Sequence, residues 1–186
     1  MTVEAFRSLI NPDDATFANP SSMVSAIQDY CRRTSQPVPE TPAEICRCIF
    51  DSLALRYKQV FNWLMEFRGL QGNLSPLTIP EQSSPTRSLS HPSPLNDVVL
   101  HIIGGGSLNK YLNQFTANAT GVVVKAGPQE GTALGNIMMQ AQSAGLVNDI
   151  WQMRQIIANS IDLVTYTPQD KALWDAAYEK YLKITQ

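Results

Sequence analysis

Three consecutive glycines, Gly104, Gly105 and Gly106, separate an aliphatic run at residues 98–103 from an amphipathic stretch at residues 108–119. The aliphatic run predicts a buried strand, and the apolar residues three and four positions apart predict a helix after it. Glycine lacks a Cβ atom, so the main chain there can approach a ligand closely, and the free N–H groups at a helix start favour anions. The sequence therefore predicts a strand, a phosphate-binding loop and a helix in succession.

The residues before this loop show helical spacing in two segments. Apolar residues at helical intervals predict a first helix at residues 23–33. Thr41 and Glu44 form the capping-box pattern of a second, longer helix, with Pro42 at its first position. We expect this second helix to end at Gly69. Its wide apolar arc indicates that it is covered on more than one side.

The residues after the loop alternate between helix and strand. Gly121 is expected to end the helix of residues 108–119, and residues 122–124 predict a second strand, parallel to the first through a right-handed crossover. A further helix should open at residues 128–130. Its inward-facing apolar residues are expected to be Leu134, Ile137, Met138 and Ala141, and Gly131 and Gly135 suggest close contact with a neighbouring element.

The tail of the chain adds two more helices, at residues 150–158 and 169–182, joined through residues 163–166. Trp174, Tyr178 and Tyr181 are expected to pack this last helix against its neighbours. We therefore predict an α/β fold with few parallel strands, flanking helices and extra C-terminal helices.

Residues 71–97 interrupt this alternation. They hold five of the 12 prolines and six serines, and such a composition cannot bury enough apolar surface to order itself. We expect a disordered surface insertion. A proline-rich ligand for a partner domain is a weaker hypothesis, because Arg87 is the only basic residue there.

Composition narrows the function classes. The formal net charge of −2 gives no basic field for nucleic acid or for an anionic membrane. No stretch of about 18 apolar residues is present to span a membrane, and the first residues lack a signal-peptide pattern. We expect a cytoplasmic protein without nucleic-acid or membrane partners.

The three cysteines suggest a reducing compartment. Cys46 and Cys48 diverge on a helix, so a zinc site is not expected. Cys31 and Cys48 could face each other between adjacent helices, and such a pair could oxidise outside the cell. Buried thiols are the expected state.

The glycine loop departs from two well-known phosphate-binding patterns. A P-loop needs a Lys and a Ser or Thr after its last glycine, and this spacing is absent. The dinucleotide pattern needs a small residue where Asn109 stands and an acidic residue at the end of the second strand, where Lys125 stands. A Rossmann-type oxidoreductase domain is therefore a weaker hypothesis.

Several motifs resemble a known family. Around the loop they are residues 100–109 (Leu-His-Ile-Ile-Gly-Gly-Gly-x-x-Asn), 112–114, 117–119 and 127–137 (Gly-Pro-x-Glu-x-x-x-Leu-Gly-Asn-Ile), and earlier ones are residues 10–20 and 48–55. Together they resemble the C-terminal region of the rhamnulokinases, FGGY carbohydrate kinases of the actin/hexokinase superfamily. The resemblance covers nearly all of residues 1–186 except residues 71–97. It implies the C-terminal, nucleotide-side part of an actin-like ATPase (ribonuclease H-like) domain.

The resemblance also implies an activity and a site. Such kinases transfer the γ-phosphoryl group of ATP, with Mg²⁺, to the 1-hydroxyl of L-rhamnulose. The family's nucleotide-binding positions correspond to Gly104, Gly105, Gly106 and Asn109. In a purely structural interpretation, Gly106 shapes the turn and Asn109 caps the next helix.

No catalytic residue is expected in this chain, because the family's general base, first phosphate loop and most sugar contacts lie upstream of the matched region. The acids Asp51, Asp97, Glu130 and Asp149 match no catalytic position, and solvated or capping roles are expected for Asp51 and Asp97. His101 is expected to be a packed core histidine. A non-catalytic nucleotide-binding or regulatory module with an actin-like fold is the alternative function.

Overall fold

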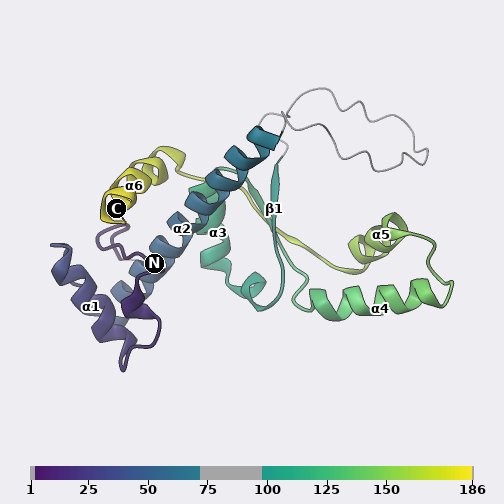
Figure 1. Ribbon diagram of the computed structural model, residues 1–186, viewed down its shortest axis with the longest axis horizontal. Helices are drawn as coiled ribbons and strands as arrows, with labels where there is room; N and C mark the ends of the chain where they lie inside the picture. Colours follow the sequence, from purple (N-terminus) through teal and green to yellow (C-terminus); the bar gives the residue numbers. More distant parts are fainter. Residues whose placement is uncertain (1–2, 72–97, 186) are drawn as a thin grey trace.

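The computed structural model describes residues 3–71 and 98–185, which form two short 3-10 helices, six α-helices and three strands. Their order is η1 (Ala15–Phe17), α1 (Met23–Arg33), α2 (Pro42–Gln71), β1 (Val99–Ile102), η3 (Gly105–Leu108), α3 (Lys110–Thr120), β2 (Val123–Ala126), α4 (Gly131–Ser143), α5 (Ile150–Ser160), β3 (Val164–Tyr166) and α6 (Lys171–Ile184). Helices α1 and α6 lie at one end of the molecule and α4 and α5 at the other (Figure 1). The insertion predicted at residues 71–97 lies outside the described residues, apart from Gln71.

The three strands form one sheet in the order β1-β2-β3. β1 and β2 are parallel, with Leu100 opposite Val124 and Ile102 opposite Ala126, which confirms the predicted parallel pair. β3 pairs with β2 in the antiparallel sense, so the expectation of parallel strands alone was wrong. β3 is only three residues long, and its sequence shows no clear alternation of apolar and polar residues. Residues 163–166 were therefore expected only to connect two helices.

β1 is an edge strand, and its burial differs from the prediction. Among the described residues β1 pairs with β2 alone, and its four residues alternate between exposed and half-buried side chains. Val99 retains 38% of its surface. The expectation of a buried strand was therefore wrong for this chain. An aliphatic run shows that a strand favours burial, but it does not show whether another segment covers the strand.

The long helix α2 begins as predicted and ends later. The backbone N–H of Thr41 donates to Glu44 Oε2 at 3.0 Å, and the N–H of Glu44 donates to Thr41 Oγ1 at 3.3 Å. These reciprocal bonds confirm the capping box. The helix continues through Gly69 to Gln71, so Gly69 does not end it.

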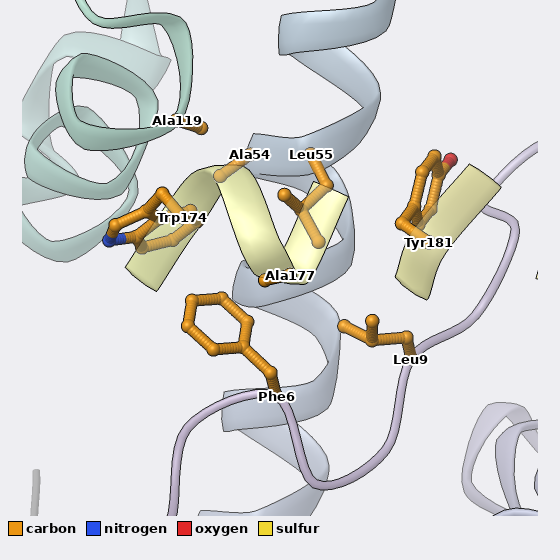
Figure 2. Close-up of a cluster of buried hydrophobic side chains, with 8 residues drawn as sticks. All are labelled: Phe6, Leu9, Ala54, Leu55, Ala119, Trp174, Ala177 and Tyr181. Atoms are coloured by element: carbon orange, nitrogen blue, oxygen red, sulfur yellow. The ribbon is translucent and has the colours of Figure 1, made fainter. Parts of the chain in front are cut away.

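The main core lies where α2, α3 and α6 meet the N-terminal segment. Figure 2 shows this cluster: Phe6, Leu9, Ala54, Leu55, Ala119, Trp174, Ala177 and Tyr181. The burial of Trp174 and Tyr181 and the partial burial of Tyr178 confirm the packing role predicted for α6. The core therefore joins segments from both ends of the sequence.

A second cluster lies between α1 and α2 and contains Cys31 and Cys48. Both thiols are free and buried, which confirms the expected state, and Cys46 is exposed. The hydrogen bond with Cys31 and, to a smaller extent, burial raise the pKa of the Cys48 thiol. Of the helices in the described ranges, none has both the length and the apolar character needed to cross a membrane.

Helix α4 is less covered than its pattern suggested. It holds no buried residue, and Ile137 keeps 56% of its surface, so the expectation that its apolar face points inward to a core was wrong. Close contact is confirmed at Gly131, where an added Cβ atom would lie 3.4 Å from the Ile103 side chain. A Cβ atom added at Gly135 would meet no atom of another described element within 4 Å.

Candidate functional site

The carboxyl ends of the two parallel strands are tied together by backbone hydrogen bonds. The N–H of Gly104 donates to the carbonyl oxygen of Pro128 at 2.9 Å, and the N–H of Gly127 donates to the carbonyl of Ile102 at 2.8 Å. Each strand is followed by a helix, so the starts of α3 and α4 lie at this same end of the sheet. Ligands of open α/β sheets bind at such strand ends.

The glycine loop itself is a 3-10 turn, η3, between Gly104 and α3. Ser107 holds the turn, since its N–H and its hydroxyl donate to the Gly104 carbonyl at 3.0 and 2.7 Å. Asn109 caps α3, because its Oδ1 accepts from the N–H of Leu112 at 3.1 Å. The capping part of the structural interpretation is thus confirmed. The cap uses Oδ1 as its acceptor, and the Nδ2 amide group of Asn109 is a separate donor.

The three glycines differ in what the chain requires of them. Gly104 has φ +80°, which only glycine adopts without strain. Gly105 has no positive φ, and a Cβ added there would meet no atom within 4 Å. A Cβ added at Gly106 would make only an ordinary contact, 3.9 Å from Ile102 Cγ2. The described fold therefore needs glycine at residue 104 but not at 105 or 106, and the missing side chain of Gly105 leaves open space.

The second loop of the site leads into α4. Gly127 has φ +118°, and α4 starts after Glu130, whose side chain makes no capping hydrogen bond. The first N–H groups of a helix have no partner within it. This end of α4 can therefore attract an anion beside the glycine loop.

A groove adjoins the glycine loop between α2, β1 and α3. Its volume is about 710 Å³, and Gly106 and Asn113 line it. Asn113 is fully buried, and its Nδ2 donates to the carbonyl of Ser107 in the glycine loop at 2.8 Å. The sequence pattern included Asn113 only as part of the motif at residues 112–114 and assigned it no role, although a polar residue on the inward stripe of the helix was the available signal.

The acidic residues considered in the sequence have structural roles where the structure describes them. Asp51 is buried, accepts from the N–H of Phe6 at 2.8 Å and pairs with Arg47 at 2.9 Å. Burial raises the pKa of Asp51, and the hydrogen bonds from Arg47 and Phe6 oppose this rise. The expectation of a solvated or capping role for Asp51 was wrong, because the N-terminal segment covers it. Asp149 caps α5, and Asp97 lies outside the described residues.

His101 stands on β1 and is exposed. The expectation of a packed core histidine was wrong, because the described residues leave the His101 side chain exposed.

The fold and the loop define an α/β domain with a glycine-rich site at the ends of parallel strands. Residues 1–144 match the C-terminal domain of the FGGY family of carbohydrate kinases. The chain belongs to this family, which confirms the resemblance seen in the sequence.

Proteins named rhamnulokinase are among the relatives. The chain is 54% identical over 175 residues to one from Bacteroides thetaiotaomicron, a match covering 94% of this chain and 31% of the relative. It is 40% identical to rhamnulokinases of Pectobacterium atrosepticum and Yersinia pseudotuberculosis serotype I, covering 100% and 98% of this chain and 32% of each relative. The chain thus spans about a third of the length of these relatives.

Proposed function

We propose that residues 1–186 are the nucleotide-side, C-terminal portion of an ATP-dependent sugar kinase with an actin-like fold. The whole kinase transfers the γ-phosphoryl group of ATP to the 1-hydroxyl of L-rhamnulose and yields L-rhamnulose 1-phosphate in the cytoplasm. The family match and the names of the relatives support this assignment. They do not favour a purely regulatory module.

In this proposal Gly104, Gly105, Gly106 and Asn109 bind the nucleotide. The observation that carries it is the open space at Gly105, because glycine costs conformational entropy and the fold does not require it there. The nucleotide lies against this bare backbone, and Asn109 Nδ2 donates to it. Mg²⁺ accompanies the phosphates and supplies charge neutralisation during transfer.

The remaining parts of the reaction belong to the rest of the kinase. Phosphoryl transfer needs a carboxylate near the attacking hydroxyl and a clamp on the terminal phosphates. Asp51 is occupied by Arg47 and by the Phe6 N–H. This chain therefore binds and orients the nucleotide, and the sugar and the general base lie on the upstream part.

Calorimetric titration with ADP tests the site. Gly105→Val adds a β-branched side chain where the fold leaves room, so this variant should stay folded by circular dichroism. We expect weak ADP binding to the parent chain, at least tenfold weaker binding to Gly105→Val, and a smaller loss for Asn109→Ala. Gly104→Ala is a poor probe, because the positive φ of Gly104 strains any other residue.

NAD serves as the control ligand and should bind neither chain. The site assignment is wrong if the folded valine variant binds ADP as the parent does. Binding of NAD in place of ADP would instead support an oxidoreductase domain.

A further inference from the structure

A network of hydrogen bonds runs from the buried side of α3 into both loops of the candidate site. Asn113 Nδ2 donates to the carbonyl oxygen of Ser107 at 2.8 Å. The N–H and the hydroxyl of Ser107 donate to the Gly104 carbonyl, and the N–H of Gly104 donates to the carbonyl of Pro128 at 2.9 Å. These four residues, called the Asn113 network below, connect α3 with the glycine loop and with the loop that leads into α4.

The Asn113 network fixes the glycine loop at two points. Gly104 is held at one end of the loop by its bonds with Ser107 and Pro128. Ser107 is held at the other end by Asn113, and the two residues between these points are glycines. A glycine segment has more backbone freedom than any other, and ordering it when a ligand binds lowers the affinity. A loop that the fold already holds at both ends avoids much of this cost.

The orientation of the Asn113 amide follows from its partner. The carbonyl oxygen of Ser107 is an acceptor, so only the Nδ2 group of the amide can bond to it. The opposite orientation would put Oδ1 against this oxygen, and two acceptors repel each other. In the observed orientation Oδ1 has no hydrogen-bond partner among residues 3–71 and 98–185. Among these residues, Asn113 therefore acts through its donor.

A second buried polar residue on α3 shows what is particular to Asn113. Thr116 is also fully buried and lies beside the same groove. Its hydroxyl donates to the carbonyl of Leu112 at 2.7 Å and so stays within its own helix. Asn113 instead directs its donor out of the helix to the glycine loop. A buried amide loses its hydrogen bonds to water, so one bond to a loop is a costly use of a core position.

We propose that Asn113 is a positioning residue for the nucleotide: it holds the glycine loop in its binding conformation and does not touch the nucleotide itself. Its amide holds Ser107, and Ser107 holds Gly104. Without the amide, the backbone at Gly105 has to be ordered each time a nucleotide binds, and the affinity falls. This inference rests on the proposed function, because it assigns Asn113 to the same nucleotide site.

Calorimetric titration of the 186-residue chain with ADP tests the effect on affinity. Asn113→Leu removes the amide donor, and the affinity should fall about fivefold, the factor that corresponds to one hydrogen bond of typical net strength. Thr116→Val is the matched control, because it also removes a buried hydrogen bond on α3 but none to the glycine loop. It should bind ADP as the parent does. Circular dichroism shows whether each variant is folded.

Amide hydrogen exchange, followed by NMR without nucleotide, tests the loop itself. The N–H groups of Ser107 and Asn109 donate to carbonyls within the loop at 3.0 and 3.1 Å. In Asn113→Leu both should exchange about fivefold faster than in the parent, because the loop opens more often. The amides of α6, in the main core, should exchange as in the parent. A purely structural role of Asn113 would instead speed exchange throughout the fold.

Ser107→Ala is a second variant that leaves the core untouched. It removes the hydroxyl donor to Gly104 and keeps the N–H donor. Its loop amides should therefore exchange faster than in the parent, and its ADP affinity should fall by less than that of Asn113→Leu. If Asn113→Leu does not fold, Ser107→Ala decides the question.

Either parental ADP affinity or parental loop exchange in a folded Asn113→Leu variant would overturn the proposal. An equal loss of affinity in Thr116→Val, or unchanged loop exchange in Ser107→Ala, would overturn it as well. If the parent chain binds no ADP, the nucleotide site is contradicted, while loop exchange still shows whether Asn113 holds the loop. The two proposals can therefore fail separately.

Discussion

At the scale of single residues, the tryptophans show how one side-chain type takes opposite roles. Trp174 on α6 is 3% exposed and packs its ring edge-on to Phe6, with centroids 4.7 Å apart and an interplanar angle of 84°. Phe115 lies on another side at 5.3 Å. Trp151 on α5 keeps 67% of its surface. Burial, rather than residue type, decides which tryptophan stabilises the fold.

We expect Trp174→Ala to lower the free energy of unfolding by about 3–5 kcal/mol, because it removes a large buried ring and leaves a cavity. Trp151→Ala is the matched control and should change it by less than about 0.5 kcal/mol. Urea denaturation followed by circular dichroism measures both. Equal losses for the two variants would mean that the α6 cluster is not the core.

At the scale of elements, the loop before α1 is held by one carboxylate. Asp14 caps η1 by accepting from the N–H and the hydroxyl of Thr16, and it pairs with Arg33 at the end of α1. The hydrogen bonds from Thr16, with a smaller contribution from Arg33, lower the pKa of Asp14 from 3.8 to about 2. One side chain thus fixes how the 3-10 helix meets α1.

This lowered pKa predicts an acid-dependent contribution. The folded-state pKa lies below the unfolded value, so the stabilisation by Asp14 is present above pH 4 and is lost as the pH falls toward 2. Asp14→Asn should be less stable than the parent at pH 7, by no more than about 1 kcal/mol because the pair is exposed. The difference should shrink between pH 4 and pH 2. Urea denaturation at several pH values measures it, and a difference independent of pH would contradict this role.

Helices α4 and α5 show the limit of reading elements from periodicity. Both form close to the predicted residues. α4 nevertheless buries no side chain, and α5 buries only Met153. The hydrophobic period of a helix tells which face is apolar, but it does not say whether a partner covers that face.

At the scale of the whole molecule, the chain corresponds to only one part of its longer relatives. It carries the glycine loop but only about a third of the length of its relatives. Its buried acid Asp51 is held by Arg47 and Phe6. Under the proposed function, the site is divided between this chain and the rest of the kinase, and this division has a direct kinetic consequence.

The purified chain, incubated with ATP, Mg²⁺ and L-rhamnulose, should form no L-rhamnulose 1-phosphate above background, because neither a base nor a phosphate clamp is expected in it. Product is measured by chromatography, with the full-length Bacteroides thetaiotaomicron rhamnulokinase as the positive control. Turnover by the chain alone would show that one of its own acids acts as the base.

Much of this protein could be predicted from the sequence, because the relevant signals are local. The capping box of Thr41 and Glu44 and the αL residue Gly121 at the end of α3 follow from residues close together in the chain. The parallel β1–β2 pair follows from the rule for a strand, a helix and a strand in succession. The glycine loop and its family resemblance were also visible as a contiguous motif. Short-range sterics and hydrogen bonds set these features.

Only the tertiary structure decided which distant segments each helix, strand and side chain contacts. Phe6 covers Asp51 from 45 residues away, β3 joins the sheet in the antiparallel sense, and the described residues leave His101 exposed. The Oδ1 of Asn113, which has no hydrogen-bond partner among residues 3–71 and 98–185, likewise becomes evident only once the helix, the strand and the loop are assembled. The sequence period determines which face of a helix or strand is apolar. Whether that face is buried, and whether a strand edge or a polar group is paired, depends on segments distant in the sequence.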